Sequence, residues 1–312
     1  IKLDSPDGKR SIHRRISSGS SFGENPTLVE VGFKKAENIR SVVVHWPSTG
    51  EVIYENLSHN NMYKIIETHC HLDYLKAKPL EDLIKDAHGN GIDKIITIAV
   101  EPDNFDPVFE LSQKYENVYC SQGIHPHDAK LSTSEALKTI EARQAEAKVL
   151  AVGEIGLDYK YTKNVADQEK QKKWFKAQLT LATKLNLPVQ IHTRDAEEEV
   201  LDILDEVGQK KVQLHCFDAN DALIKRAVKA GYYLSIPVRA VKEKVFFNLI
   251  QHVPLSRILT ETDGPYLHFD YKQRNEPKEV LHTIKKIAEV KGVEVDTVAN
   301  TILQNYKELY EL

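Results

Sequence analysis

Five stretches of this chain end in residues that bind metal ions, and each has the pattern of a buried β-strand. They are Lys64–His71, Val149–Glu154, Val189–His192, Val212–His215 and Ile258–Asp263. Together they supply four histidines and two carboxylates: His69, His71, His192, His215, Glu154 and Asp263. Imidazole and carboxylate groups suit Zn, Mn, Co or Fe, and Mg is less favoured where histidine dominates. The set is large enough to hold two divalent metal ions.

The spacing of the first ligands fits a strand end. His69 and His71 are two residues apart, and side chains alternate on a strand, so both imidazoles face one side and can bind one metal. A central carboxylate such as Glu154 can bridge two metals about 3.5–4 Å apart. Ligands at the carboxyl ends of several strands are typical of a (β/α)₈ barrel, which builds its active site there.

Strand-like and helix-like segments alternate from Lys64 onward. Eight strands are predicted: Ile65–His69, Lys94–Val100, Val118–Gln122, Val149–Glu154, Val189–His192, Val212–His215, Tyr232–Ile236 and Ile258–Thr262. Amphipathic helices are predicted at Leu80–His88, Phe105–Tyr115, Ser134–Ala147, Asp167–Leu185, Asn220–Ala230, Lys278–Val290 and Val295–Tyr310. Ser132–Glu135 and Asp195–Glu198 both match the capping box of a helix start. The alternation predicts an α/β fold, a (β/α)₈ TIM barrel. An open doubly wound sheet is the alternative, but its usual G-x-G-x-x-G turn is missing.

Residues 1–61 have a different pattern. Arg40–Trp46 and Glu51–Leu57 are predicted strands, Leu28–Phe33 alternates, and Gly19–Gly23 is a turn, so we expect a β meander. This segment contains no candidate catalytic cluster. We therefore divide the chain into the meander, 1–61, and the barrel, 62–312. The only methionine, Met62, stands where an independent barrel protein would begin. The meander is either a true fused domain or coding sequence of different origin joined ahead of that start.

Composition restricts the partners. The net charge of the 312-residue chain is −4, so a nucleic acid would have to be held by local cationic groups and by metals. No apolar run approaches the ~20 residues of a membrane span. Cys70, Cys120 and Cys216 cannot all pair internally, and no C-x-x-C spacing points to thiolate ligation. Buried free thiols suit a reducing compartment, so we expect a cytoplasmic protein.

Seven motifs from residue 62 onward resemble the TatD-family metal-dependent deoxyribonucleases. They are T-H-C-H-L-D (68–73), G-I-H-P-H (123–127), V-G-E-I-G-L-D-Y (152–159), Q-I-H-T-R-D-A (190–196), H-C-F (215–217), T-E-T-D-G-P-Y-L (260–267) and R-N-E-P (274–277). The resemblance covers about residues 62–312. It implies a metal-dependent hydrolase barrel, two divalent metal ions, and hydrolysis of phosphodiester bonds in DNA, often from the 3′ end.

The resemblance also implies roles for single residues. One metal would be held by His69, His71, Glu154 and Asp263, and the second by Glu154, His192 and His215. His125 resembles the family histidine that meets the scissile phosphate, and Asp263 is expected to accept the proton of the attacking water. Arg194 is expected to clamp a phosphate, because a guanidinium fork matches phosphate geometry; a plain surface arginine is the alternative. Asp158 is expected to orient a ligand or a water.

Residues 11–66 resemble another family, the ASPIC/UnbV module, through S-G-S-S-F-G (18–23), V-E-V-G-F (29–33), S-V-V-V-H-W-P-S (41–48) and Y-E-N-L (54–57). That module is typical of extracellular repeat proteins. Two other functions therefore stay open: a hydrolase of a small ester or amide on the same barrel, and a binding protein that acts through the N-terminal segment. The G-I-H-P and H-T-R runs favour a phosphate substrate, and an intact ligand set favours an enzyme. The sequence leaves the metal identity, the strand preference and the oligomeric state open.

Overall fold

The structure is a computed structural model that describes residues 2–4, 11–13, 38–46, 50–58, 64–144 and 146–311. The chain divides into two compact units, Ile1–Met62 and Tyr63–Leu312. The first unit contains a four-stranded antiparallel sheet in the order β2-β1-β3-β4. Its strands are β1 (Lys2–Asp4), β2 (Ser11–His13), β3 (Asn38–Trp46) and β4 (Gly50–Ser58). The predicted Arg40–Trp46 and Glu51–Leu57 strands form the β3–β4 hairpin. The alternating 28–33 run and the 19–23 turn lie outside the described residues.

The second unit is a nearly closed barrel of eight parallel strands, and the sequence prediction of a TIM barrel is confirmed. The strands follow one another around the sheet from β5 to β12. They are β5 (Ile65–Cys70), β6 (Ile92–Ala99), β7 (Val118–Gln122), β8 (Val149–Asp158), β9 (Val189–Arg194), β10 (Val212–Leu214), β11 (Tyr233–Ile236) and β12 (Ile258–Thr260). Hydrogen bonds join β5 to β12 and to the segment that follows β12: the Thr260 hydroxyl donates to Ile66 O at 3.1 Å, and Asp263 N donates to His69 O at 2.9 Å.

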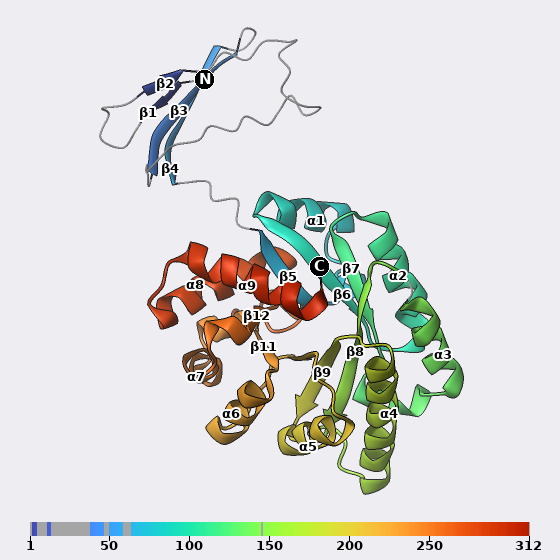
Figure 1. The fold of residues 1–312 in the computed structure, drawn as a ribbon. Coiled ribbons are helices and arrows are strands. Elements are labelled where there is room, and N and C mark those ends of the chain that lie inside the picture. The colour runs from blue at the N-terminus through green and yellow to red at the C-terminus, as the bar shows by residue number, and fades with distance from the viewer. Residues whose placement is uncertain are drawn as a thin grey trace. The chain divides into compact units, whose positions relative to one another are not determined.

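Helices surround the outside of the strands (Figure 1). They are α1 (Leu80–Gly89), α2 (Phe105–Lys114), α3 (Ser134–Arg143), α4 (Val165–Lys184), α5 (Glu197–Val207), α6 (Asp221–Ala230), α7 (Lys244–His252), α8 (Val280–Lys291) and α9 (Val295–Tyr310). The predicted helix ranges include neither α5 nor α7, and for α5 only a start signal at 195–198 was expected. The two predicted capping boxes are wrong in detail: Thr133 caps α3, and Ala196 precedes α5 without a side-chain cap.

The barrel strands are mostly buried because helices cover one face and the barrel interior covers the other. Residues of β8, for example, are all buried. A polar layer nevertheless crosses the interior below the carboxyl ends of the strands. Gln190 donates to the Tyr310 hydroxyl at 2.7 Å, and that hydroxyl donates to Gln213 at 2.6 Å. Helix α9 thus sends Tyr310 into the barrel, where it fixes two glutamines that lie near the candidate site.

Two further expectations concern membrane-spanning segments and the pairing of the cysteines. Among the described residues, no helix combines the length and the apolar character that crossing a membrane requires. All three cysteines are free; Cys70 and Cys120 are buried, and Cys216 is partly exposed.

Candidate metal centre

The predicted site residues gather at one cavity, at the carboxyl ends of the strands. The cavity has a volume of about 570 Å³. Seven of the eight line it: His71, His125, Glu154, His192, Arg194, His215 and Asp263. His69, the eighth, lies beneath it and is completely buried. The sequence therefore identified residues that the fold brings together from five strand ends and from the segment after β7.

The strand ends differ from the prediction in both directions. Strand β8 runs on from Glu154 to Asp158, and β9 runs on to Arg194, while β10 and β12 stop before His215 and Asp263. Asp263 has a φ of 56°, a left-handed conformation that an aspartate tolerates. Gly156 lets β8 and β9 approach closely, because a Cβ there would collide with the carbonyl oxygen of His192.

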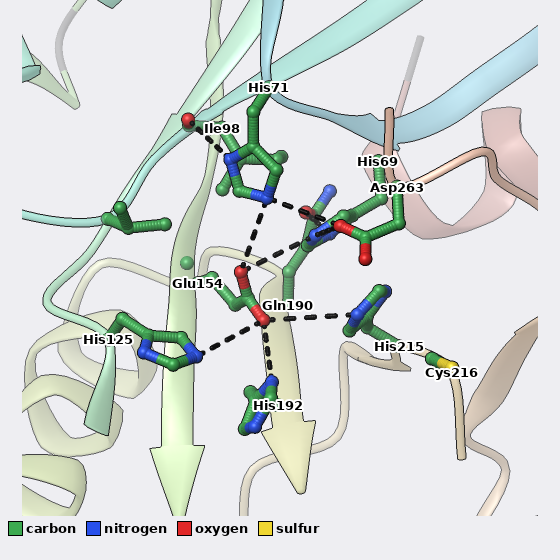
Figure 2. A network of polar contacts seen from close by, with 12 residues as sticks. His69, His71, Ile98, His125, Glu154, Gln190, His192, His215, Cys216 and Asp263 are labelled. Atoms are coloured by element: carbon green, nitrogen blue, oxygen red, sulfur yellow. Dashed lines mark hydrogen bonds and ion pairs between the residues drawn. The ribbon is translucent and has the colours of Figure 1, made fainter. Parts of the chain in front are cut away.

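Glu154 lies at the centre, and its two oxygens face different groups (Figure 2). His69, His71 and Asp263 lie around its Oε2 atom, and we call these three residues the Oε2 side. Oε2 lies 3.5 Å from His69 Nε2 and 3.8 Å from His71 Nε2. The Asp263 Oδ1 lies 3.7 Å from the first of these nitrogens and 3.3 Å from the second. Two atoms that each bind one ion at about 2.1 Å in a tetrahedron lie about 3.4 Å apart. The four separations fit one shared ion.

Hydrogen bonds on the far side of each ring leave the ligating nitrogen free. His69 Nδ1 lies 3.0 Å from Gln190 Oε1, and His71 Nδ1 lies 3.3 Å from the Ile98 carbonyl oxygen. Both oxygens only accept, so both Nδ1 atoms donate, and each Nε2 faces the carboxylates and would offer its lone pair to an ion. The His69 Nε2 is buried and has no hydrogen-bond partner. A divalent ion would satisfy this atom, so the residues present fit a metal.

The Oε1 side consists of His125, His192 and His215. Glu154 Oε1 lies 2.9 Å from His192 Nδ1 and 4.0 Å from His215 Nε2. His215 Nδ1 contacts the Glu261 carboxylate at 2.9 Å, which leaves its Nε2 lone pair directed at Glu154. His192 Nε2 contacts Asp158 Oδ2 at 3.2 Å. Two imidazoles here are therefore oriented by carboxylates, an arrangement common around metal ligands.

His125 belongs to the same side but its hydrogen bonding differs. Its Nε2 lies 3.8 Å from Glu154 Oε1. Its Nδ1 accepts the backbone N–H of His127 at 3.2 Å. Burial lowers the pKa of His125 well below its usual value, and His192 lowers it further, so the ring is neutral. A neutral ring whose Nδ1 accepts carries its proton on Nε2. His125 is thus a hydrogen-bond donor that points into the cavity.

The carboxylates of the centre stabilise the protonated histidines, and the histidines stabilise the ionised Glu154. Burial lowers the pKa of His69, but Glu154 raises it to about 9. Burial likewise lowers the pKa of His192, and its hydrogen bonds to Asp158 and Glu154 raise it to about 9. Burial raises the pKa of Glu154, yet His69 and the other imidazoles hold it well below its usual value. Without metal, the protonated imidazoles of His69 and His192 therefore supply positive charge beside the ionised Glu154, as bound cations would.

Sequence reasoning missed several groups that complete the cavity. Arg239 and Tyr271 line it, and the Arg239 guanidinium lies 5.1 Å from the Tyr271 ring centre. His127 also lines it and contacts Asp158 Oδ2 at 2.9 Å. The G-I-H-P-H run contains this histidine, so its proximity to His125 was a usable signal. Glu261 precedes Asp263 by two residues and could have been found in the same way, whereas nothing in the sequence marks Arg239.

Arg194 lies where the prediction placed it, at the end of β9 and on the cavity wall. Its guanidinium lies 5.4 Å from the Tyr161 ring centre. Among the described residues it forms no ion pair, so its donors are available to a ligand. Asp158 contacts His192, as expected for a residue that orients a ligand.

Comparisons with known proteins agree with this geometry. Residues 66–311 match the model of the TatD related DNase family, and residues 1–71 match that of ASPIC and UnbV. An uncharacterized metal-dependent hydrolase of Bacillus subtilis, YabD, is 34% identical over 255 residues, which cover 80% of this chain and 99% of that protein. The 3′-5′ ssDNA/RNA exonuclease TatD of Escherichia fergusonii is 29% identical and covers 75% of this chain and 94% of that protein.

The same relationship appears among solved structures. The structure of YjjV, a TatD homologue from Escherichia coli K12, superposes with a TM-score of 0.74 at 28% identity, covering 80% of this chain and 99% of that one. The family model spans most of the chain, and the predicted hydrolase class is confirmed with it. The chain belongs to the TatD related DNase family.

Proposed function

We propose that this protein hydrolyses phosphodiester bonds of DNA with two divalent metal ions, held on the two sides of Glu154. The observation that supports this most directly is the division of the Glu154 carboxylate, with Oε2 facing His69 and His71 and Oε1 facing His192 and His215. The ions, when bound, supply Lewis-acid charge and lower the pKa of water. Zn, Mn or Co suits this histidine-rich set better than Mg.

Asp263 is the proposed proton acceptor. Burial raises its pKa, but the nearby His71 and His215 imidazoles lower it below the usual value. The carboxylate therefore stays ionised at neutral pH. It lies on the cavity wall, 3.3 Å from His71 Nε2, so it can receive a proton from a water that enters beside the Oε2 side.

His125 and Arg194 are the proposed phosphate contacts. His125 presents an Nε2 proton to the cavity, and Arg194 presents a guanidinium without an ion pair in the described part of the chain. Donors aimed at a phosphate group stabilise the charge that grows on its oxygens during attack. An amide substrate would have less use for two such donors, which is why a phosphodiester is favoured over a small ester or amide.

Two finer proposals concern the direction in which DNA is degraded and the location of the protein. Removal of nucleotides from the 3′ end is supported by the similar exonuclease of Escherichia fergusonii. A cytoplasmic location is supported by the free thiols of Cys70, Cys120 and Cys216.

The test uses the metal-reconstituted full chain. It is incubated with single- and double-stranded DNA labelled at the 5′ or the 3′ end, and with ester and amide substrates in parallel. We expect a ladder of shortened DNA and little turnover of amides. In the same assay Arg194→Ala should weaken DNA cleavage with the metal content unchanged, while Arg226→Ala, at an exposed pair with Asp202 and Asp205, should not. Turnover of amides or esters without DNA cleavage would assign the barrel to another hydrolase class.

A further inference from the structure

A second cavity, of about 270 Å³, adjoins the metal centre. His127 lines both cavities, so its ring forms part of the partition between them. The second cavity lies beside η3 (Pro126–Leu131) and the segment that joins β8 to α4. The proposed reaction at the metal centre does not use it.

Cationic groups surround this second cavity. Lys130, Lys163 and Lys170 line it, and Asp167 is its one acidic lining residue. Asp167 contacts Lys170 at 3.0 Å, and Lys163 lies 3.7 Å from Asp195 outside the lining. The chain as a whole has a net charge of −4. The cavity lining is thus locally cationic although the whole chain has a negative net charge. A nucleic-acid ligand of this chain would require such a local cationic site.

Tyr161 gives the cavity an aromatic wall. Its side chain is 65% exposed, which is unusual for so large a ring and leaves a face free. Its ring centre lies 5.5 Å from that of His127, and the Arg194 guanidinium lies 5.4 Å from it. Tyr161 therefore stands next to the proposed phosphate contact of the metal centre. An exposed ring beside cationic groups is the usual platform for an unpaired base.

Hydrogen bonds within the protein hold this aromatic wall in place. The Tyr161 backbone N–H donates to Asp158 Oδ1 at 3.1 Å, while Asp158 Oδ2 contacts both His127 and His192. Gln171 of α4 accepts the Asp158 N–H at 3.0 Å and donates to the Thr162 hydroxyl at 2.9 Å. One buried carboxylate thus fixes a candidate metal ligand and the wall of the second cavity in the same frame.

We propose that this cavity binds the nucleotide next to the one that reacts, with its base on Tyr161 and its phosphate near Lys130 and Lys163. The inference rests on the proposed function, because it names a second subsite of the same nuclease. Stacking on Tyr161 requires an unpaired base, so the substrate class is single-stranded nucleic acid of at least two nucleotides.

The experiment compares substrates that reach the cavity with one that does not. Metal-reconstituted full chain is assayed with a single-stranded decanucleotide, a dinucleotide and bis(p-nitrophenyl) phosphate, which has no second nucleotide. Tyr161→Ala should lower kcat/KM for the decanucleotide about 10-fold, the order expected for loss of a stacked base, and Tyr161→Phe should restore it. Lys130→Ala/Lys163→Ala should make the logarithmic salt dependence of KM shallower by about 0.7, the change expected for loss of one phosphate contact on a single strand. Lys173→Ala, on α4 outside the cavity lining, is the matched control.

The outcomes separate the two proposals. If the parent chain cleaves no phosphodiester, the proposed function fails. If the parent cleaves the decanucleotide and the Tyr161 and lysine variants do so equally well, only the subsite is rejected. A loss of equal size on bis(p-nitrophenyl) phosphate also rejects the subsite, since it would mean that these residues support the metal centre itself.

Discussion

The two sides of Glu154 offer a metal ion different starting conditions. On the Oε2 side, the four separations between imidazole nitrogens and carboxylate oxygens lie between 3.3 and 3.8 Å. On the Oε1 side, His192 forms a 2.9 Å hydrogen bond with Glu154, while His215 stands 4.0 Å away. On the first side, the ligand atoms already have separations that suit a shared ion. On the second, an ion must replace a hydrogen bond and draw His215 inward, so we expect the first side to bind more tightly.

The largest effect is expected where the two sides meet. Glu154→Ala removes the one carboxylate that faces both, so the chain should bind fewer than two ions and lose hydrolysis by at least about 10³-fold, because the bound charge contributes several kcal/mol to the transition state. Elemental analysis and a nuclease assay measure the two effects. Glu197→Ala, at the start of α5, is a control outside the cavity lining. Two ions still bound by Glu154→Ala would mean that this residue does not bridge.

Single-ligand variants should separate the two sides. His192→Ala should leave one tight ion, because the Oε2 side keeps its full set. His71→Ala should weaken the first ion by more than the 10–100-fold that loss of an outer partner costs. Isothermal titration with Zn or Mn gives both affinities, and His88→Ala, exposed on α1, controls for loss of a histidine. Equal weakening of the first ion by both variants would contradict the proposed order of affinities.

The sequence predicted the barrel and the metal-binding residues on both sides of Glu154, but it did not predict the contacts that orient those residues. Alternation and buried strands identified the barrel, and ligand types at strand ends identified the two sets, because both depend on local pattern. The orientation of the histidines on both sides depends on Gln190, Ile98 and Glu261, which fix the tautomers of His69, His71 and His215. Those contacts join residues far apart in the chain, so no local pattern encodes them.

The errors in the strand ends have a similar origin. Asp195 and Asp263 have left-handed φ values of 54° and 56°, which a continuing strand cannot contain. At Asp195 this displaces the predicted cap of α5, since the side chain approaches Lys163 rather than the helix start. Helix propensity alone would have favoured the capping box, and tertiary contacts decided otherwise.

Proton release should show whether both sides exchange an imidazolium for an ion. The pKa values of His69 and His192, about 9 without metal, lie above neutrality, so each ring is protonated at pH 7.5 and must lose a proton to ligate. Binding of each ion should release about one proton, and the release should fall as the pH rises through 9. Titration calorimetry in buffers of different ionisation enthalpy measures it. His192→Ala should abolish the release on the Oε1 side only, and release that does not change between pH 7.5 and 10 would reject both assignments.

The smallest effect is expected from removing residues 1–61. Every group on either side of Glu154 lies after Met62, and Tyr63–Leu312 is a compact unit with its own barrel. Residues 62–312 should therefore fold, bind the same number of ions and keep hydrolytic activity within about twofold. Metal content, thermal unfolding and the nuclease assay are compared with those of the full chain. A true fused domain that docks on the barrel should protect residues 56–62 from limited proteolysis, whereas unrelated coding sequence should leave them open to it. If the shortened chain is insoluble or inactive where the full chain works, the metal centre depends on the N-terminal unit, and neither side of Glu154 is complete in the barrel alone.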